Sequence, residues 1–216
     1  MIKYSGVNEV GLAIRDAAQL NGFQLDSKQT AVIGYFEDLA EKLVKKKMTN
    51  GFLSRICPKP SIYGVYLWGG VGRGKTFIVD SFYHAVPIDK KKRIHFHQFM
   101  DGVHKSLRKY QGHKNPLKLI GKEIEKDTHL LCLDELQVTD IGDAMIMQNL
   151  LTALFVQRVA VVATSNTEPA NLYKDGLQRE KFLPAIDQIE SNMQIVELDS
   201  GADYRMTTFS RSGVYY

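Results

Sequence analysis

The sequence predicts an α/β fold in which a central parallel β-sheet is flanked by helices. From Tyr63 onward, short apolar runs of strand length alternate with longer segments of helical character, a rhythm typical of parallel strands joined by crossover helices. The run at 129–135 contains four consecutive apolar residues and ends in two acidic residues, as expected for a strand buried on both faces. Because 216 residues can bury one good core, we expect one or at most two domains.

The predicted elements follow in order along the chain. Residues 26–47 are predicted to form a helix, because Asp26 is a cap candidate and apolar residues recur behind it at helical spacing. A loop of Gly, Pro and Ser covers 50–61, which divides an N-terminal helical segment and linker, 1–61, from a core, 62–216. Strands are predicted at 63–68, 93–100, 129–135, 159–164 and 194–198. Helices are predicted at 75–85, around 102–110, at 121–126 and, capped by Thr139, at 140–157.

The composition is that of a soluble globular protein. Hydrophobic residues make up 44% and charged residues 24% of the chain, both ordinary values, and no apolar stretch approaches the ~20 residues of a membrane helix. The N-terminus lacks the apolar region of a signal peptide, so we expect a cytoplasmic protein with no integral membrane segment. Cys57 falls in a loop and Cys132 in a predicted core strand, which indicates neither a disulfide framework nor a zinc site.

The net charge of +4 is concentrated in two basic clusters, 45–47 and 90–93. The first ends a helix, where cations complement the helix dipole, and the second is predicted to lie in a turn after Pro87. We interpret both as solvated, with an anionic partner as the alternative. No nucleic-acid reader of a defined type is recognisable, so nucleic acid is not an expected partner.

A glycine-rich segment between the first core strand and the following helix carries the clearest motif. Residues 69–76 read G-G-V-G-R-G-K-T and fit a phosphate-binding loop, whose glycines let backbone N–H groups close around phosphate oxygens. Lys75 would reach the β- and γ-phosphates, and the Thr76 hydroxyl would ligate Mg²⁺. A chance glycine-rich turn would need neither the Lys-Thr pair nor the preceding strand. The expected nucleotide contacts are Gly69, Gly70, Val71, Gly72, Arg73, Gly74, Lys75, Thr76 and Phe77.

Two acidic residues, Asp134 and Glu135, close the strand at 129–135. In an open parallel sheet, ligands bind at the carboxyl ends of the strands, so both carboxylates are expected beside the phosphate loop. Asp134 fits a Mg²⁺ partner acting through water, and Glu135 fits the base that polarises the attacking water. A solvated turn is the alternative, but the presence of Lys75 and Thr76 in the same predicted site disfavours it.

Two further polar residues follow later strands. Asn166 leaves the strand at 159–164 and can donate to the γ-phosphate or hold the attacking water while its carbonyl touches Glu135. Arg179, on a segment anchored by apolar residues, could reach the γ-phosphate on a neighbouring subunit, which implies a homo-oligomer. The alternative for Arg179 is a surface salt bridge with Glu180 or Asp175.

The histidines of the run 94–100 are expected on one strand face with Phe99. His95 and His97 could share a metal ion, but no third ligand with suitable spacing is evident, so packed strand histidines are the preferred interpretation.

Taken together, these motifs resemble the ZapE cell-division ATPases and their mitochondrial relatives, a branch of the AAA+-like P-loop proteins. The resemblance runs from about Asp26 to Arg205. Its motifs are Y-L-W-G-G-V-G-R-G-K-T (66–76), H-F-H-Q-F-M (95–100), C-L-D-E-L-Q-V-T-D-I-G-D-A-M (132–145), A-T-S-N (163–166), L-Y-K-D-G-L-Q-R-E-K-F-L-P-A-I (172–186) and D-Y-R (203–205).

The resemblance implies an AAA+-like core that hydrolyses ATP with Mg²⁺ and associates with the FtsZ ring at the inner face of the membrane in bacteria; mitochondrial relatives are tied to protein quality control. Leu136 and Gln137 stand where such proteins commonly have two aromatic residues, and family members continue past the position of Tyr216 into the AAA+ lid, which we expect this chain to lack. We expect Gln29 to contact adenine. The alternative functions are a nucleotide-gated interaction module with little hydrolysis and a helicase-loader-like ATPase.

Overall fold

The computed structural model describes residues 9–22, 24–48 and 63–198. The predicted loop at 50–61, Cys57 and the motif at 203–205 lie outside these ranges. Before the core come α1 (Val10–Leu20) and α2 (Ser27–Met48). The core elements are β1 (Gly64–Trp68), α3 (Lys75–Ala85), β2 (Lys91–His95), α4 (Phe96–Lys109), α5 (Pro116–Asp127), β3 (Leu130–Asp134), α6 (Ile141–Val156), β4 (Ala160–Ser165), η3 (Pro169–Asn171), η4 (Arg179–Lys181), α7 (Leu183–Asn192) and β5 (Gln194–Glu197).

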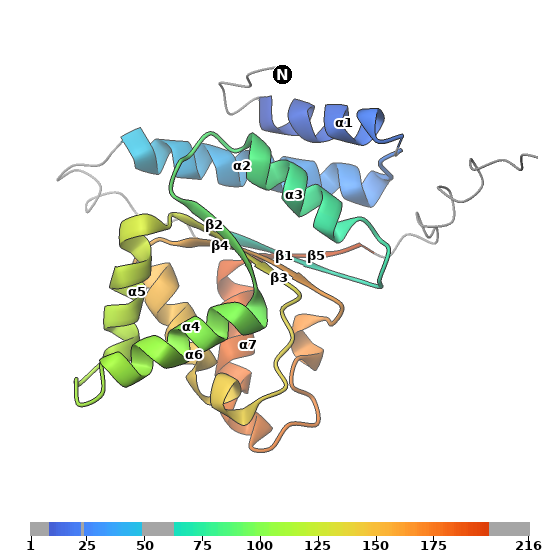
Figure 1. The fold of residues 1–216 in the computed structure, drawn as a ribbon. Helices are drawn as coiled ribbons and strands as arrows, with labels where there is room; N and C mark the ends of the chain where they lie inside the picture. Colours follow the sequence, from blue (N-terminus) through green and yellow to red (C-terminus); the bar gives the residue numbers. More distant parts are fainter. Residues whose placement is uncertain (1–8, 23, 49–62, 199–216) are drawn as a thin grey trace, which may run out of the picture.

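The described strands form one parallel sheet in the order β2-β3-β4-β1-β5. Helices α1, α2 and α3 cover one face of this sheet, and α4 to α7 cover the other (Figure 1). The predicted α/β architecture with a flanked parallel sheet is therefore confirmed. Because strand order is not sequence order, β1 lies between β4 and β5, and the segments that leave β1, β3 and β4 meet at one edge.

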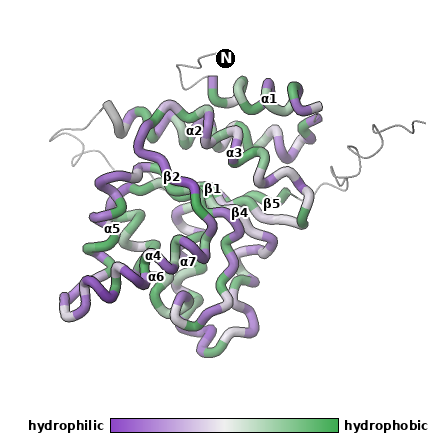
Figure 2. Tube along the Cα trace, viewed as in Figure 1, coloured by the Kyte–Doolittle hydropathy of each residue, from purple (hydrophilic) through white to green (hydrophobic). Residues whose placement is uncertain are grey.

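Strand side chains divide between two hydrophobic clusters, one on each face of the sheet. In β3, Leu130 and Cys132 face the cluster with α1, α2 and α3, whereas Leu131 and Leu133 face the cluster with α4 to α7. The alternation follows from the period of two in a strand. Hydrophobic residues accordingly run along the central strands, while the helices alternate between hydrophobic and hydrophilic residues along their length (Figure 2). Helices α1 and α2 thus share their core with the sheet.

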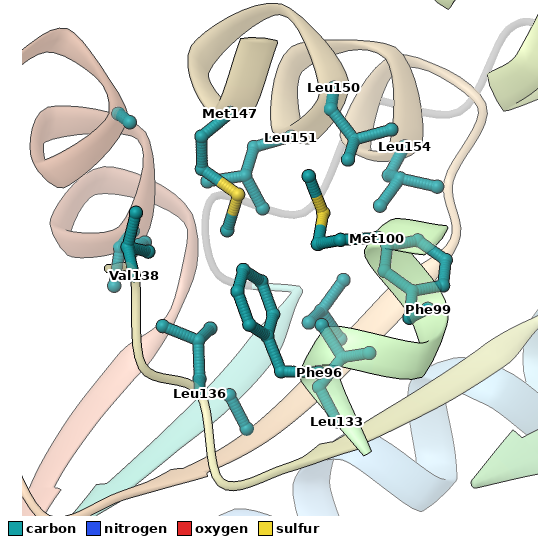
Figure 3. Packing of buried hydrophobic residues seen from close by; sticks show 14 of the residues in the cluster. Phe96, Phe99, Met100, Leu133, Leu136, Val138, Met147, Leu150, Leu151 and Leu154 are labelled. Atoms are coloured by element: carbon teal, nitrogen blue, oxygen red, sulfur yellow. The ribbon is translucent and has the colours of Figure 1, made fainter. Parts of the chain in front are cut away.

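The predicted strand at 93–100 is wrong beyond His95, where α4 begins. Phe96, Phe99, Met100 and Val103 recur at helical spacing and are buried, so one helix face covers the sheet. Figure 3 shows three of these side chains, Phe96, Phe99 and Met100, packed toward Leu133 and α6. A strand would have turned Phe96 and Phe99 to opposite faces. His95 and His97 therefore do not share a strand face, and no cluster of three metal-ligating side chains occurs in the part of the chain that is described.

Other boundaries differ by smaller amounts. Helix α5 begins at Pro116 rather than 121, because proline suits the first turn and Ile120 is buried within it. The cap of α6 is Asp140, not Thr139: Oδ1 of Asp140 accepts hydrogen bonds from the N–H groups of Gly142 (2.6 Å) and Asp143 (3.2 Å). Among the described residues, no helix is both long enough and apolar enough to cross a membrane.

The basic cluster at 90–93 is not a turn, because Lys91, Lys92 and Arg93 belong to β2. Lys90 and Lys92 are exposed, as expected, whereas Lys91 and Arg93 are partly buried. The Lys91 ammonium donates to the carbonyls of Tyr83 (2.6 Å) and Val86 (3.0 Å) at the end of α3. Arg93 is paired with acidic residues described below. The parallel sheet places this segment beside β3, where burial favours such contacts over hydration.

Candidate functional site

The segment between β1 and α3 folds as a tight loop that depends on its glycines. Gly69 has φ 144° and Gly74, the residue before α3, has φ 80°, values that side chains bearing a Cβ rarely adopt. A Cβ on Gly69 would lie 2.5 Å from the carbonyl oxygen of Leu198. The loop is therefore packed against the end of β5 and curls into the N-terminus of α3, a geometry that suits an anion.

The Lys75 side chain lies inside this loop. Its Nζ donates hydrogen bonds to the carbonyls of Gly69 (2.6 Å) and Gly70 (2.7 Å) and to Oδ1 of Asn166 (3.0 Å). Burial lowers the pKa of Lys75, and the charge of Arg73 lowers it further. The carbonyls and the Asn166 amide compensate for the water that this ammonium has lost. Lys75 is thus a preformed cation at the centre of the loop.

Glu135 sits on a turn that is held to β4. Its backbone φ is 56°, an unusual value for a residue with a Cβ, and its N–H donates to Oγ1 of Thr164 (3.0 Å). The next residue is fixed on both sides, because the Leu136 N–H donates to the Thr164 carbonyl (2.7 Å) and Oγ of Ser165 donates to the Leu136 carbonyl (2.8 Å). The Glu135 side chain itself is 80% exposed.

Asp134 is buried behind Glu135. Its Oδ2 accepts a hydrogen bond of 2.7 Å from Nε of Arg93, whereas its Oδ1 has no hydrogen-bond partner among the described residues. A buried carboxylate oxygen without a partner is costly unless a ligand or water completes it. Thr76 lines the cavity, and its hydroxyl and this carboxylate are the kinds of oxygen ligand that Mg²⁺ prefers. These residues therefore fit the predicted metal.

A cavity of about 370 Å³ opens between the loop, the N-terminal side of α2 and the ends of β3 and β4. Most of the predicted nucleotide contacts line it, together with Glu135 and Asn166. Gly69, Gly70, Asp134 and Arg179 do not contribute to its wall. The lining residues are Leu25, Gln29, Val71, Gly72, Arg73, Gly74, Lys75, Thr76, Phe77, Glu135, Thr164, Ser165 and Asn166.

Two predicted side chains make contacts within the chain that the sequence did not predict. The Asn166 carbonyl accepts from Lys75, whereas we expected it to touch Glu135. Gln29 forms a reciprocal cap with Asp26, since the Gln29 N–H donates to Oδ1 of Asp26 (2.8 Å) and the Asp26 N–H donates to Oε1 of Gln29 (3.1 Å). Nε2 of Gln29 donates to the Arg73 carbonyl (3.1 Å). Gln29 consequently joins the start of α2 to the phosphate loop.

Arg179 begins the short helix η4, away from the cavity wall. Its guanidinium donates to the Ala170 carbonyl (2.7 Å), and its Nε is buried without a hydrogen-bond partner in the described part of the chain. Its described interaction is thus with the backbone rather than with Glu180 or Asp175. The guanidinium is anchored but does not reach Lys75 or Glu135 of the same chain.

Sequence reasoning missed several residues that build this site. Arg93 was grouped with neighbouring lysines, although its position on a strand beside β3 could have suggested a partner for Asp134. Thr164 and Ser165 were overlooked, although polar residues at the carboxyl end of a parallel strand are candidates for a binding site. Leu25 carried no signal, since a single leucine before a helix is common.

The fold and the site define an α/β protein of the P-loop type. A glycine-rich loop joins β1 to α3, acidic residues end β3, and Asn166 follows β4. The chain belongs to the AFG1-like ATPase family, whose model it matches over residues 11–216. The resemblance inferred from the motifs is thereby confirmed.

Relatives in this family come from bacteria and eukaryotes. The chain is 38% identical over 205 residues to the cell division protein ZapE of Escherichia coli K12, an alignment that covers 89% of this chain and 55% of ZapE. It is 43% identical over 165 residues to lactation elevated protein 1 homolog B of Danio rerio, covering 71% of this chain and 33% of that protein. The chain thus spans about half, or less, of the length of these relatives.

Solved structures share the fold at low sequence identity. The DnaI crystal structure superposes with a TM-score of 0.55 at 18% identity, covering 85% of this chain and 93% of the chain in that structure. AMPPCP-bound DnaA from Aquifex aeolicus superposes with a TM-score of 0.54 at 16% identity, covering 88% of this chain and 53% of DnaA. At such identities, the likeness establishes the architecture alone.

Proposed function

We propose that this chain binds ATP in the cavity beside the phosphate loop and hydrolyses it to ADP and phosphate. The observation that carries the proposal is the 3.0 Å hydrogen bond from Nζ of Lys75 to Oδ1 of Asn166, at a cavity whose wall also includes Glu135. A cation for phosphate, an amide that can place water and a carboxylate base thus converge on one space. A structural loop would not need all three.

The residues of the phosphate loop would bind and orient the triphosphate. Lys75 would exchange the Gly69 and Gly70 carbonyls for phosphate oxygens, because an anion is a better partner for an ammonium than a neutral carbonyl. The backbone N–H groups of the loop and the N-terminus of α3 would bind the remaining oxygens. Gln29 at the cavity wall would contact adenine while it holds Arg73.

The hydrolytic step would use Glu135 as the base. It would accept a proton from the attacking water as the new P–O bond forms and the bond to the β-phosphate oxygen breaks, with Asn166 placing that water. Thr76 and, through water, Asp134 would hold Mg²⁺, which when bound neutralises charge on the phosphate oxygens. Arg179 of a neighbouring copy would complete the site in a homo-oligomer.

Single-turnover hydrolysis of radiolabelled ATP by the purified chain, with excess protein, tests this proposal. We expect release of labelled phosphate that requires Mg²⁺ and disappears in Glu135→Gln. Tight ATP binding without phosphate release in the parent would instead favour the nucleotide-gated interaction module. Absence of ATP binding would refute both.

We further propose that the ATPase acts in bacterial cell division through the FtsZ ring, at the division site near the inner membrane. Support comes from the 38% identity to the cell division protein ZapE. The experiment is co-sedimentation of the chain with FtsZ polymers in the presence of ATP, ADP or no nucleotide, with Lys75→Ala as the control. Nucleotide-dependent pelleting supports the proposal, and equal pelleting with and without FtsZ contradicts it.

A further inference from the structure

Arg93 forms a bridge between two elements of the candidate site. From β2, at the edge of the sheet, its Nε donates to Oδ2 of Asp134 at the end of β3 (2.7 Å). Its Nη1 donates to Oδ1 of Asp80 on α3. The Arg93 side chain is only 18% exposed, so its two contacts replace most of its hydration.

The acceptor on α3 lies four residues after Thr76, one turn further along the same face of the helix. Arg93 therefore links the helix that carries the Thr76 hydroxyl to the strand that carries the Asp134 carboxylate. The contact to Oδ2 also orients the carboxyl group, so that Oδ1 is the oxygen left without a hydrogen-bond partner among the described residues.

The planar guanidinium suits this task, because two of its nitrogens can serve separate acceptors at a fixed angle. Burial lowers the pKa of Arg93, but the hydrogen bonds and charges of Asp134 and Asp80 outweigh burial and raise it overall. An arginine side chain stays protonated in proteins, so Arg93 is a permanent cation between the two carboxyl groups.

We infer that Arg93 is a positioning residue for the divalent cation of this site, holding α3 and β3 together so that the Thr76 hydroxyl and Oδ1 of Asp134 face one ion. The inference rests on the proposed nucleotide function. Residues that orient metal ligands typically contribute about 10- to 100-fold to metal affinity.

The test measures how much Mg²⁺ strengthens the binding of a fluorescent ADP analogue, as the ratio of its Kd in EDTA to its Kd in Mg²⁺. We expect Arg93→Met to decrease this ratio about tenfold or more while the Kd in EDTA stays near that of the parent. Arg93→Lys keeps the positive charge but lacks the planar guanidinium with its separate donor nitrogens, so it should recover only part of the ratio.

Lys91→Met is the matched control. Lys91 lies on the same face of β2, two residues earlier, and also contacts α3, through the carbonyls of Tyr83 and Val86 rather than a carboxylate. We expect this variant to lose stability yet keep the Mg²⁺ ratio of the parent. Asp80→Ala should decrease the ratio, and combining it with Arg93→Met should add little, because both act through one bridge.

Removing the positive charge of Arg93 would by itself strengthen Mg²⁺ binding and increase the Kd ratio, because like charges repel. A decrease in the ratio therefore indicates that Arg93 positions the ligands. A parent ratio above one that stays unchanged or increases in Arg93→Met and Asp80→Ala overturns the inference while leaving the proposed function standing. A parent ratio of one overturns it as well. Absence of analogue binding in EDTA and in Mg²⁺ refutes the nucleotide function itself and the inference with it. If Arg93→Met does not fold, Asp80→Ala and Arg93→Lys decide.

Discussion

Nζ of Lys75 lies 3.0 Å from Oδ1 of Asn166, a residue 91 positions further along the chain. This hydrogen bond joins the phosphate loop to the end of β4. It also means that Lys75 is held in place by three oxygens before any phosphate arrives. A binding site organised in this way loses little side-chain entropy when its ligand enters.

Replacement of Lys75 should eliminate nucleotide binding. Lys75→Ala removes the buried cation that the loop offers to the β- and γ-phosphates. Titration with a fluorescent ATP analogue should show no saturable binding, whereas Lys92→Ala, which removes an exposed lysine of β2, should bind as the parent does. Equal affinity in Lys75→Ala and the parent would mean that the loop does not bind phosphate.

Glu135→Gln should retain ATP but lose hydrolysis. The amide preserves the shape of a side chain that is 80% exposed, so the fold should not change, but the amide cannot accept a proton. We expect single-turnover hydrolysis to decrease about 10²- to 10⁴-fold. Glu190→Gln, an exposed acidic residue on α7, is the control. Turnover within about threefold of the parent would assign the base to another group.

Arg179→Ala should leave ATP affinity unchanged and decrease activity only in assembled protein, because Arg179 lies away from the cavity wall of its own chain. Arginine fingers contribute roughly 10³- to 10⁵-fold in other NTPases. Mixing Arg179→Ala with Glu135→Gln should partly restore hydrolysis, since the first protein supplies the base and the second supplies the arginine.

The control for the mixing experiment is Lys181→Ala, an exposed residue of the same short helix whose Nζ donates to Oε1 of Gln178, the residue that caps this helix (2.7 Å). Complexes of Lys181→Ala alone should be fully active. If mixed complexes are seen by light scattering but activity does not return, Arg179 acts through its hydrogen bond to Ala170 rather than across subunits.

Gly69→Ala should destabilise the chain, whereas Gly70→Ala should not. At Gly69 the backbone φ of 144° and the Leu198 carbonyl at 2.5 Å both oppose a Cβ, and such strain costs about 1–3 kcal/mol. At Gly70 the nearest atom would be in the Arg73 side chain at 3.6 Å, an ordinary contact. Chemical denaturation should show the difference in the free energy of unfolding. Equal stability of the two variants would contradict this account of the loop.

Most of the fold could be predicted from the sequence, because its signals are local. The periods of two and of 3.6 distinguish strands from helices within a few residues. The prediction was wrong at 96–100, where a run rich in aromatic residues and histidine continues directly from the strand. There, burial of Phe96, Phe99 and Met100 on one side decided in favour of a helix.

The sequence by itself determined the glycine-rich loop and the acidic end of β3. Both features are formed by residues that are adjacent in the chain, so their pattern can be recognised without the tertiary structure. Only the tertiary structure decided the pairing of Arg93 with Asp134, separated by 41 positions, and of Glu135 with Thr164, separated by 29. These residues meet because their strands are neighbours in the sheet. The order of the strands depends on how the whole chain buries its apolar faces. No local pattern records that choice.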